Sequence, residues 1–328
     1  MKSVIVNSSK ESASGHLLRL NDNTQKIIFF ILIVVCLSPL VSAPIALLLG
    51  FGVAQFIGHP YLYLNHKATH LLLQISVVGL GFSMNVGSAL KAGKEGILFT
   101  VVSIFGTLLL GFVTGKLLRI EKKTSFLISA GTAICGGSAI AALSPVIKAK
   151  ENQTSVALGI IFMLNSVALF LFPYIGHRLH LSQTQFGLWC AIAIHDTSSV
   201  VGAASKYGNQ ALAIATTVKL ARALWIIPVA FGSAFLFKSK DAKIKIPYFI
   251  FLFVLAMMAN TYLPVVQKIS PYVVAVSKSG LTLTLFLIGC GLSLKVLKSI
   301  GAKPLAQGIL LWAVISLAAL WAVVSLHG

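Results

Sequence analysis

A histidine, an acid and three hydroxyl residues follow one another inside an apolar stretch, at His195-Asp196-Thr197-Ser198-Ser199. A lone charge at the centre of a bilayer costs roughly 2.5–3.5 kcal/mol, so such residues face partners or water and are candidates for function. Histidine titrates near neutral pH and can carry a proton. We therefore predict that His195 and Asp196 handle a coupling ion, H⁺ or Na⁺, and that the three hydroxyls contribute to a substrate site.

Two cations, Lys219 and Arg222, lie in the next apolar stretch. They are three residues apart and therefore on one face of a helix. Beside free backbone N–H groups, two such cations make an anion site, so we predict that both bind substrate. The alternative is a purely structural ion pair with Asp196.

A third candidate region runs over residues 131–142 and is followed by Pro145, inside a segment apolar enough to cross a bilayer. Glycine costs a helix roughly 1 kcal/mol and proline roughly 3 kcal/mol. A membrane segment tolerates such breaks where the backbone is buried in protein or lines a cavity, and transporters place substrate sites there. The alternative is close packing of small residues between helices. We predict that the substrate is bound here, mainly by backbone N–H groups, at Cys135, Gly136, Gly137, Ser138 and Ala139.

Asn165, on the apolar stretch between these two regions, could support either broken segment across a helix interface. We predict that it takes part in ion coupling with His195 and Asp196. The cluster stands out because the chain is otherwise almost free of charge within its apolar stretches.

The composition defines the class of protein. Of 328 residues 57% are hydrophobic and only 10% are charged, whereas a soluble domain carries about 25% charged residues. Apolar runs of 18 or more residues recur along the chain, which predicts an all-α polytopic membrane protein. The four cysteines lack the spacing of a disulfide framework or a zinc site, and we expect no cofactor beyond a coupling ion.

We expect a polar tail over residues 1–26 and a single transmembrane domain over 27–328. About 11 transmembrane segments are predicted, or 10 if the first two form one kinked helix. Their approximate ranges are 27–37, 45–57, 68–84, 96–118, 124–147, 154–175, 186–205, 210–237, 246–263, 271–294 and 304–326.

The net charge of +19 arises from 26 Lys+Arg against 7 Asp+Glu, and the cations lie in the tail and in short loops. Such cations orient membrane proteins and contact anionic lipid, so we expect lipid rather than nucleic acid as the partner. With 11 segments and the N-terminus inside, the inner loops and the tail together hold about 17 cations and the outer loops about six. This bias predicts a cytoplasmic N-terminus and a C-terminus outside.

Two internal similarities are present in the sequence. The stretch 79–84 (GLGFSM) resembles 289–294 (GCGLSL), and 133–138 (AICGGS) resembles 193–198 (AIHDTS). Paired interruptions in two parts of a chain are a sequence indication of a transporter's binding site. Their spacing does not resolve into a simple repeat of five plus five segments.

The segment 133–142 (AICGGSAIAA) with Pro145-Val146-Ile147, then His195-Asp196, then Lys219-Leu220-Ala221-Arg222, resembles the YeiH family of sulfate exporters. The resemblance extends from about the second span to the end. That family is similar to the bile-acid, arsenite and riboflavin transporters, which implies inverted repeats with broken helices that cross at the midplane. It also implies a bacterial inner-membrane protein that moves a small anion. Where the family commonly has Val-Ala-Gln-Val, this chain has Thr197-Ser198-Ser199-Val200, and the added hydroxyls could change the substrate or the coupling ion.

We therefore expect a secondary transporter of sulfate, a related sulfur oxyanion or an organic anion, working by alternating access and coupled to H⁺ or Na⁺, or acting as an exporter. The alternatives are an anion channel and a sodium-coupled organic-anion symporter. A second copy of the chain, in a homodimer, is a candidate partner. An intramembrane enzyme is disfavoured because the single embedded acid cannot form a paired-carboxylate site and no HExxH or GxSxG motif is present.

Overall fold

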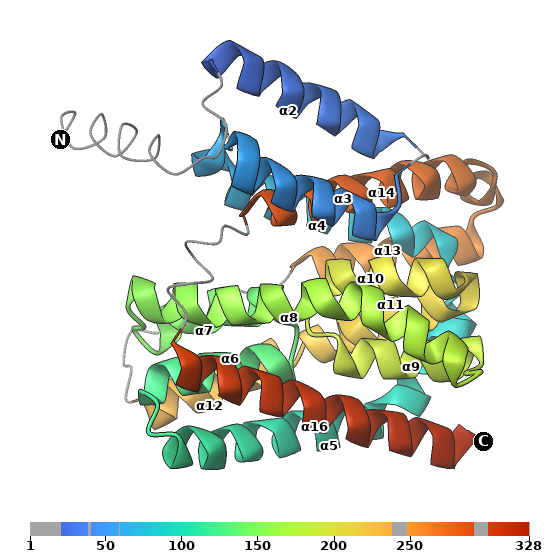
Figure 1. The fold of residues 1–328 in the computed structure, drawn as a ribbon. Coiled ribbons are helices and arrows are strands. Elements are labelled where there is room, and N and C mark those ends of the chain that lie inside the picture. The colour runs from blue at the N-terminus through green and yellow to red at the C-terminus, as the bar shows by residue number, and fades with distance from the viewer. Residues whose placement is uncertain (1–20, 39–40, 59, 238–247, 292–300, 328) are drawn as a thin grey trace.

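The computed structural model describes residues 21–38, 41–58, 60–237, 248–291 and 301–327, and most of the predicted polar tail lies outside them. The described chain is almost entirely helical (Figure 1). Five helical stretches are long and apolar enough to cross a membrane, and further apolar helices are shorter. The predicted class, a polytopic α-helical membrane protein, is confirmed. The five long stretches are Leu98–Leu117, Glu151–Arg178, Asn209–Leu236, Pro264–Gly291 and Ala302–Ser325.

The helices form two groups that lie one above the other in Figure 1. In the first group α3 and α4 both pack on α14, α13 packs on α4, and α2 packs on α14. Its elements are α2 (Asp22–Leu37), α3 (Ala43–Gly52) with the π-helix η2 (Val53–Ile57), α4 (Leu62–Leu80) with the 3₁₀ turn η3 (Gly81–Ser83), α13 (Tyr248–Tyr262) and α14 (Pro264–Gly291). The first two predicted spans are thus separate helices, and α2 begins five residues before the predicted start of the domain.

The second group contains the broken segments that the sequence singles out. In it α5 packs on α6 and α11, α9 packs on α11, and α16 packs on α5, α6, α8 and α9. Its elements are α5 (Val86–Leu117), α6 (Lys122–Ala133), α7 (Gly137–Val146), α8 (Glu151–Arg178), α9 (Gln183–Ala193), α10 (Thr197–Tyr207), α11 (Asn209–Ala223), α12 (Ile226–Leu236) and α16 (Ala302–His327).

Helices α6 and α7 form a re-entrant hairpin. The chain reverses at residues 134–136, and the end of α7 returns to the start of α6, where Lys123 Nζ donates to the Lys148 carbonyl at 2.6 Å. At the same end Gln153, in the first turn of α8, donates to the Glu121 carboxylate just before α6. Small residues allow the two arms to pack closely, because a methyl group at Gly131 would lie 2.9 Å from Ile140 Cδ1.

Helices α9 and α10 form a second re-entrant hairpin. Tyr207, the last residue of α10, stacks on Phe186 near the start of α9 and donates to the Leu181 carbonyl at 2.6 Å. The 28-residue helix α8 joins the open end of the first hairpin to that of the second. At 1.5 Å per residue, α8 separates these two ends by about 42 Å, so the hairpins enter from opposite sides.

This arrangement corrects the predicted course of residues 124–147 and 186–205. Each was expected to cross the membrane as a broken helix, but each turns back at its break. A hairpin and a crossing share the same hydropathy and the same glycine-rich interruption, so only the contacts between arms distinguish them. The two hairpins nevertheless have opposite orientations, as an inverted repeat requires.

The hairpins also redistribute the loop cations. Lys148 and Lys150 lie at the same end of the second group as Arg119 and Lys122, and Arg178 lies at the other end, beside the start of α9. The first change adds two cations to the end where α6 begins and the second removes one from it, so the cation excess at that end still increases. If that end is cytoplasmic, the positive-inside rule is satisfied better by hairpins than by crossings.

Candidate functional site

The tips of the two hairpins meet in the interior of the second helix group. Gly136, at the first tip, has φ +64° and ψ −125°, a conformation that side chains disfavour. A methyl group at Gly136 would lie 3.3 Å from the carbonyl carbon of His195 and 3.4 Å from Cα of Asp196. Glycine is therefore required here both by its own backbone angles and by the close approach of the second tip.

The first tip exposes the N-terminus of α7. The helix begins at Gly137, and no side chain caps it, because its N-cap residue is Gly136. The first N–H groups of a helix have no partner within the helix, and the helix dipole makes this end equivalent to about half a positive charge. Gly137 and the half-buried Ser138 line a cavity of about 250 Å³. This is the arrangement that binds anions at helix N-termini.

The second tip exposes a carboxylate. Asp196 is 5% exposed, caps α10 and lines the same cavity. Its Oδ2 accepts from the Ser199 amide at 3.2 Å, from Ser199 Oγ at 3.4 Å and from Ser198 Oγ. The cavity therefore has an open positive helix end on one side and a hydroxyl-bonded carboxylate on the other.

Asn165 on α8 supports the second tip. Its Oδ1 accepts from the His195 amide at 3.1 Å and from the Asp196 amide at 3.4 Å. These two N–H groups lie in the break between α9 and α10, where no helical acceptor is available. The predicted support of a broken segment by Asn165 is thus confirmed, while its part in ion coupling stays a prediction.

Lys219 and Arg222 lie behind the tips, on α11, and both are fully buried. Lys219 Nζ donates to the carbonyls of Ile194 at 2.7 Å and Ala191 at 3.3 Å; Arg222 donates to those of Ala133 at 2.6 Å and Ile192 at 3.3 Å. These carbonyls end α9 and α6, so each cation neutralises the negative end of a helix dipole. Neither side chain lines the cavity of about 250 Å³, and direct binding of substrate by either stays a prediction.

Several buried polar atoms around the tips have no hydrogen-bond partner in the part of the chain that the structure describes. Both ring nitrogens of the fully buried His195 belong to this set, as do Arg222 Nη2, Asn165 Nδ2 and Thr132 Oγ1. Buried polar groups are normally paired, and unpaired groups gather at sites that take water, ions or ligands. The unpaired atoms therefore belong to the same region as the predicted site.

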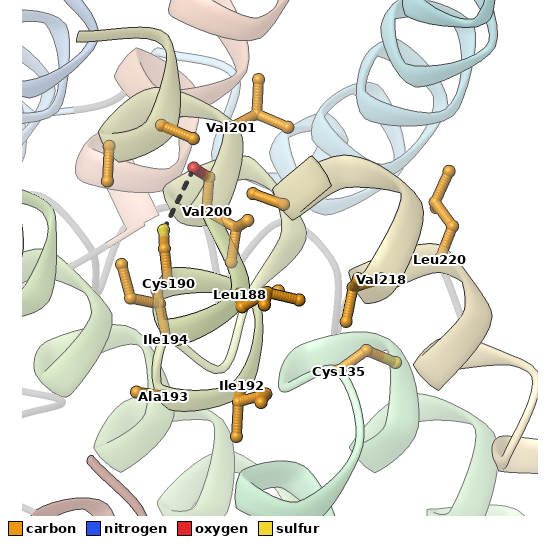
Figure 2. Close-up of a cluster of buried hydrophobic side chains, with 14 of the residues drawn as sticks. Cys135, Leu188, Cys190, Ile192, Ala193, Ile194, Val200, Val201, Val218 and Leu220 are labelled. Carbon is orange, nitrogen blue, oxygen red and sulfur yellow. Dashed lines mark hydrogen bonds between the residues drawn. The ribbon is translucent and has the colours of Figure 1, made fainter. Parts of the chain in front are cut away.

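Cys135 and Ala139 have a different environment from their neighbours. Both side chains are buried in the hydrophobic core, and Figure 2 shows Cys135 in the same cluster as Val218 and Leu220. In the same cluster the Cys190 thiol donates to the Val200 carbonyl at 3.6 Å and ties α9 to α10 (Figure 2). Cys135 therefore packs the first tip. Thr197, Ser198 and Ser199 are buried in the first turn of α10.

The first helix group completes the cavity with residues that the sequence reading missed. Asn65, Thr69 and His70 from α4 line it opposite Gly137 and Asp196, together with Ile288 and Gly291 of α14. Asn65 Nδ2 also donates to the Leu287 carbonyl at 2.9 Å, which joins α4 to α14. The predicted spans 45–57 and 68–84 leave Asn65 outside a helix, but α4 begins at Leu62. The i, i+4 spacing of Asn65 and Thr69 is the signal that places both on one face of this helix.

Glycines in the two similar stretches, 79–84 and 289–294, allow neighbouring helices to approach closely. A methyl group at Gly79 on α4 would lie 3.1 Å from Ser277 Cβ on α14, and one at Gly289 on α14 would lie 2.2 Å from the Leu47 carbonyl oxygen on α3. Gly79 and Gly289 hold the first helix group together, and neither of them lines the cavity. The rest of the second stretch, residues 292–294, lies outside the described residues.

Fold and site together define a polytopic membrane protein in which two opposed re-entrant hairpins meet beside a cavity between two helix groups. The chain matches the family described as "Conserved hypothetical protein 698" over residues 27–308, and it belongs to that family. It is 58% identical over 285 residues to a UPF0324 membrane protein of Bacteroides thetaiotaomicron, covering 86% of each chain. It is 52% identical to one of Porphyromonas gingivalis, covering 85% of this chain and 86% of the relative. A third relative, from Photobacterium profundum, is 50% identical, and the match covers 89% of this chain and 90% of the relative. No solved structure matches the chain.

Proposed function

We propose that the protein is a secondary transporter that moves a small anion across the membrane by alternating access. The observation that carries this proposal is the meeting of the two opposed hairpin tips at a cavity that both helix groups line. Non-helical backbone at membrane depth is tolerated where it lines a cavity, and in transporters it marks the substrate site. A site between two helix groups can open to one side or the other when the groups move relative to each other.

In this proposal the anion binds at the N-terminus of α7. The first-turn N–H groups and the Ser138 hydroxyl supply the donors, and the helix dipole supplies the positive potential. Asp196 with Ser198 and Ser199 supplies oxygens for a coupled H⁺ or Na⁺. Lys219 and Arg222 hold the tips in position and add positive potential from behind.

The substrate class rests on the resemblance to the sulfate exporters and on this donor set. We propose sulfate, a related sulfur oxyanion or an organic anion; sodium-coupled symport of an organic anion is the alternative mode. We also propose that the protein lies in the inner membrane with its N-terminus in the cytoplasm and its C-terminus outside, with no catalytic reaction of its own.

The proposal is tested by anion flux in proteoliposomes. Ser138 borders the cavity and is only half-buried, so Ser138→Phe should fill the cavity without disturbing the core. We expect the variant to fold, as judged by its melting temperature in detergent, and to lose at least tenfold in the uptake rate of labelled sulfate. Leu109→Phe, at a 67% exposed position on α5, is the matched control and should transport normally. Normal uptake by Ser138→Phe would refute the site.

An anion channel is the second candidate, because the open N-terminus of α7 would also suit a pore. A carrier saturates with substrate and shows counterflow, in which internal unlabelled anion accelerates entry of labelled anion. A channel shows neither. Flux that rises without saturation and follows voltage alone would favour the channel.

A further inference from the structure

Among the described residues, the interior of the protein holds more positive than negative buried side chains. Lys219 and Arg222 are fully buried, and Asp196, at 5% exposed, is the buried acid. The other acids whose side chains the structure describes, Asp22, Glu121 and Glu151, are exposed. Among the described residues neither ring nitrogen of His195 has a hydrogen-bond partner, and a buried imidazolium without a partner would be costly, so the ring is neutral.

The helix dipoles do not remove this imbalance. The C-termini of α6 and α9 each contribute about half a negative charge, and the N-termini of α7 and α10 each contribute about half a positive charge. All four ends gather at the two tips, so their contributions cancel. The ammonium of Lys219 is hydrogen-bonded to two carbonyls, which favours its charged form. One positive charge therefore remains without a partner at the centre of the second helix group.

The unpaired atoms give an independent indication of a missing ligand. Arg222 Nη2 is buried and donates to nothing within the described residues, and the same holds for Asn165 Nδ2. Both are obligate donors. A region with surplus donors and one surplus positive charge is suited to a bound anion.

From this balance we infer that one negative charge completes the site, so that the loaded carrier is electrically neutral and the empty carrier bears one positive charge. This inference rests on the proposed transport function. A monovalent anion then binds without a coupling ion. A divalent anion such as sulfate binds together with one H⁺ or Na⁺ held at Asp196. In both cases one net negative charge crosses the membrane per cycle.

The test measures the charge that accompanies each anion. Proteoliposomes are clamped at set potentials with K⁺ and valinomycin, at equal pH and equal Na⁺ on both sides, and labelled methanesulfonate or labelled sulfate is allowed to equilibrate. One charge per anion predicts a tenfold change in the equilibrium ratio for each change of about 59 mV. We expect this slope for methanesulfonate without any coupling ion, and for sulfate only when H⁺ or Na⁺ is available to bind.

The variant Asp196→Asn changes the balance in a defined direction. Asparagine is as good a helix N-cap as aspartate, so α10 keeps its cap while the buried charge rises by one. Sulfate should then be carried without a coupling ion, and its equilibrium ratio should change a hundredfold for each 59 mV, which corresponds to two charges. Asp22→Asn, at an exposed acid, is the matched control and should behave as the wild type.

The outcomes separate this inference from the proposed function. Two results overturn the inferred charge balance but not the proposed transport function. One is an equilibrium anion ratio that does not change with membrane potential, and the other is wild-type sulfate transport with two charges per anion. An unchanged sulfate slope in a folded Asp196→Asn variant also overturns it. No protein-dependent flux of either anion overturns the proposed function, and the inference with it. If Asp196→Asn does not fold, the inference is tested by the wild-type protein alone, from the dependence of the methanesulfonate and sulfate equilibrium ratios on membrane potential.

Discussion

At the scale of single residues, Gly136 is the point on which the meeting of the tips depends. Its φ of +64° suits glycine, and a Cβ at this position would lie only 3.3–3.4 Å from the backbone of the tip that carries His195 and Asp196. Both conditions act on the same atom, a Cβ that glycine lacks. The residue next to it, Gly137, begins the helix whose N-terminus faces the cavity.

We predict that Gly136→Ala destabilises the protein by about 1–3 kcal/mol, because the residue is held in a sparsely populated backbone region. Displacement of the second tip should also reduce transport strongly. Gly106→Ala on α5 is the matched control: nothing lies within 4 Å of its new methyl group, and alanine favours a helix by about 1 kcal/mol. Thermal unfolding in detergent should show a lower melting temperature for the first variant and an equal or higher one for the second. Equal stability of both would contradict the contact at the tip.

At the scale of elements, the two hairpins decide which loops share a side of the membrane. The end of α7 returns to the start of α6, and the end of α10 returns to the start of α9. Helix α8 lies between them as a single crossing. A broken helix that crossed would place the loop at Lys148 on the opposite side from the loop at Arg119.

Cysteine accessibility tests this arrangement. The four native cysteines are buried and free, so single surface cysteines can be labelled with a membrane-impermeant maleimide. We predict that Arg119→Cys and Lys150→Cys react from one side and that Arg178→Cys and Lys206→Cys react from the other. The measurement compares spheroplasts with inverted vesicles. Labelling of Arg119→Cys and Lys150→Cys from opposite sides would show that residues 122–146 cross the membrane.

At the scale of the whole molecule, the cavity lies between two helix groups that meet over limited surfaces. The main contacts between the groups are made by α10 with α14 and α3, by α8 with α3, and by α13 with α5. One such contact is close: a methyl group at Gly202 on α10 would lie 3.2 Å from Ala43 Cβ on α3. Alternating access requires such contacts to change during the cycle.

A disulfide across this boundary should therefore stop transport. Ala43→Cys with Gly202→Cys places two Cβ atoms near the spacing of about 3.5–4.5 Å that a disulfide needs. We expect oxidation to abolish anion flux and a reductant to restore it. The control pair is Gly79→Cys with Ser277→Cys, which has a similar spacing of 3.1 Å but lies within the first group, and its flux should not change on oxidation. Full flux in a completely oxidised 43–202 pair would mean that the two groups do not move apart.

The sequence alone determined the class of protein and the position of its unusual segments. Long apolar runs with few charges form a bundle of membrane helices, because backbone groups in lipid must be hydrogen-bonded within the protein. Interruptions within residues 131–142 and at 195–199 followed from the cost of glycine and of buried charge in such helices. Helix propensity and the cost of burying a charge depend on the local residue types, so both can be derived from the amino-acid sequence.

The tertiary structure decided the course of the chain at each break and the partners of each buried charge. Whether a broken helix crosses or returns depends on contacts such as Lys123 with Lys148, which join parts of the chain that hydropathy treats separately. The same holds for Lys219 and Arg222, whose donors are taken up by carbonyls at the ends of α9 and α6. It also holds for Asn65 and Thr69, which reach the cavity from the other helix group. These are non-local contacts, and their geometry exists only once the two hairpins have folded against each other.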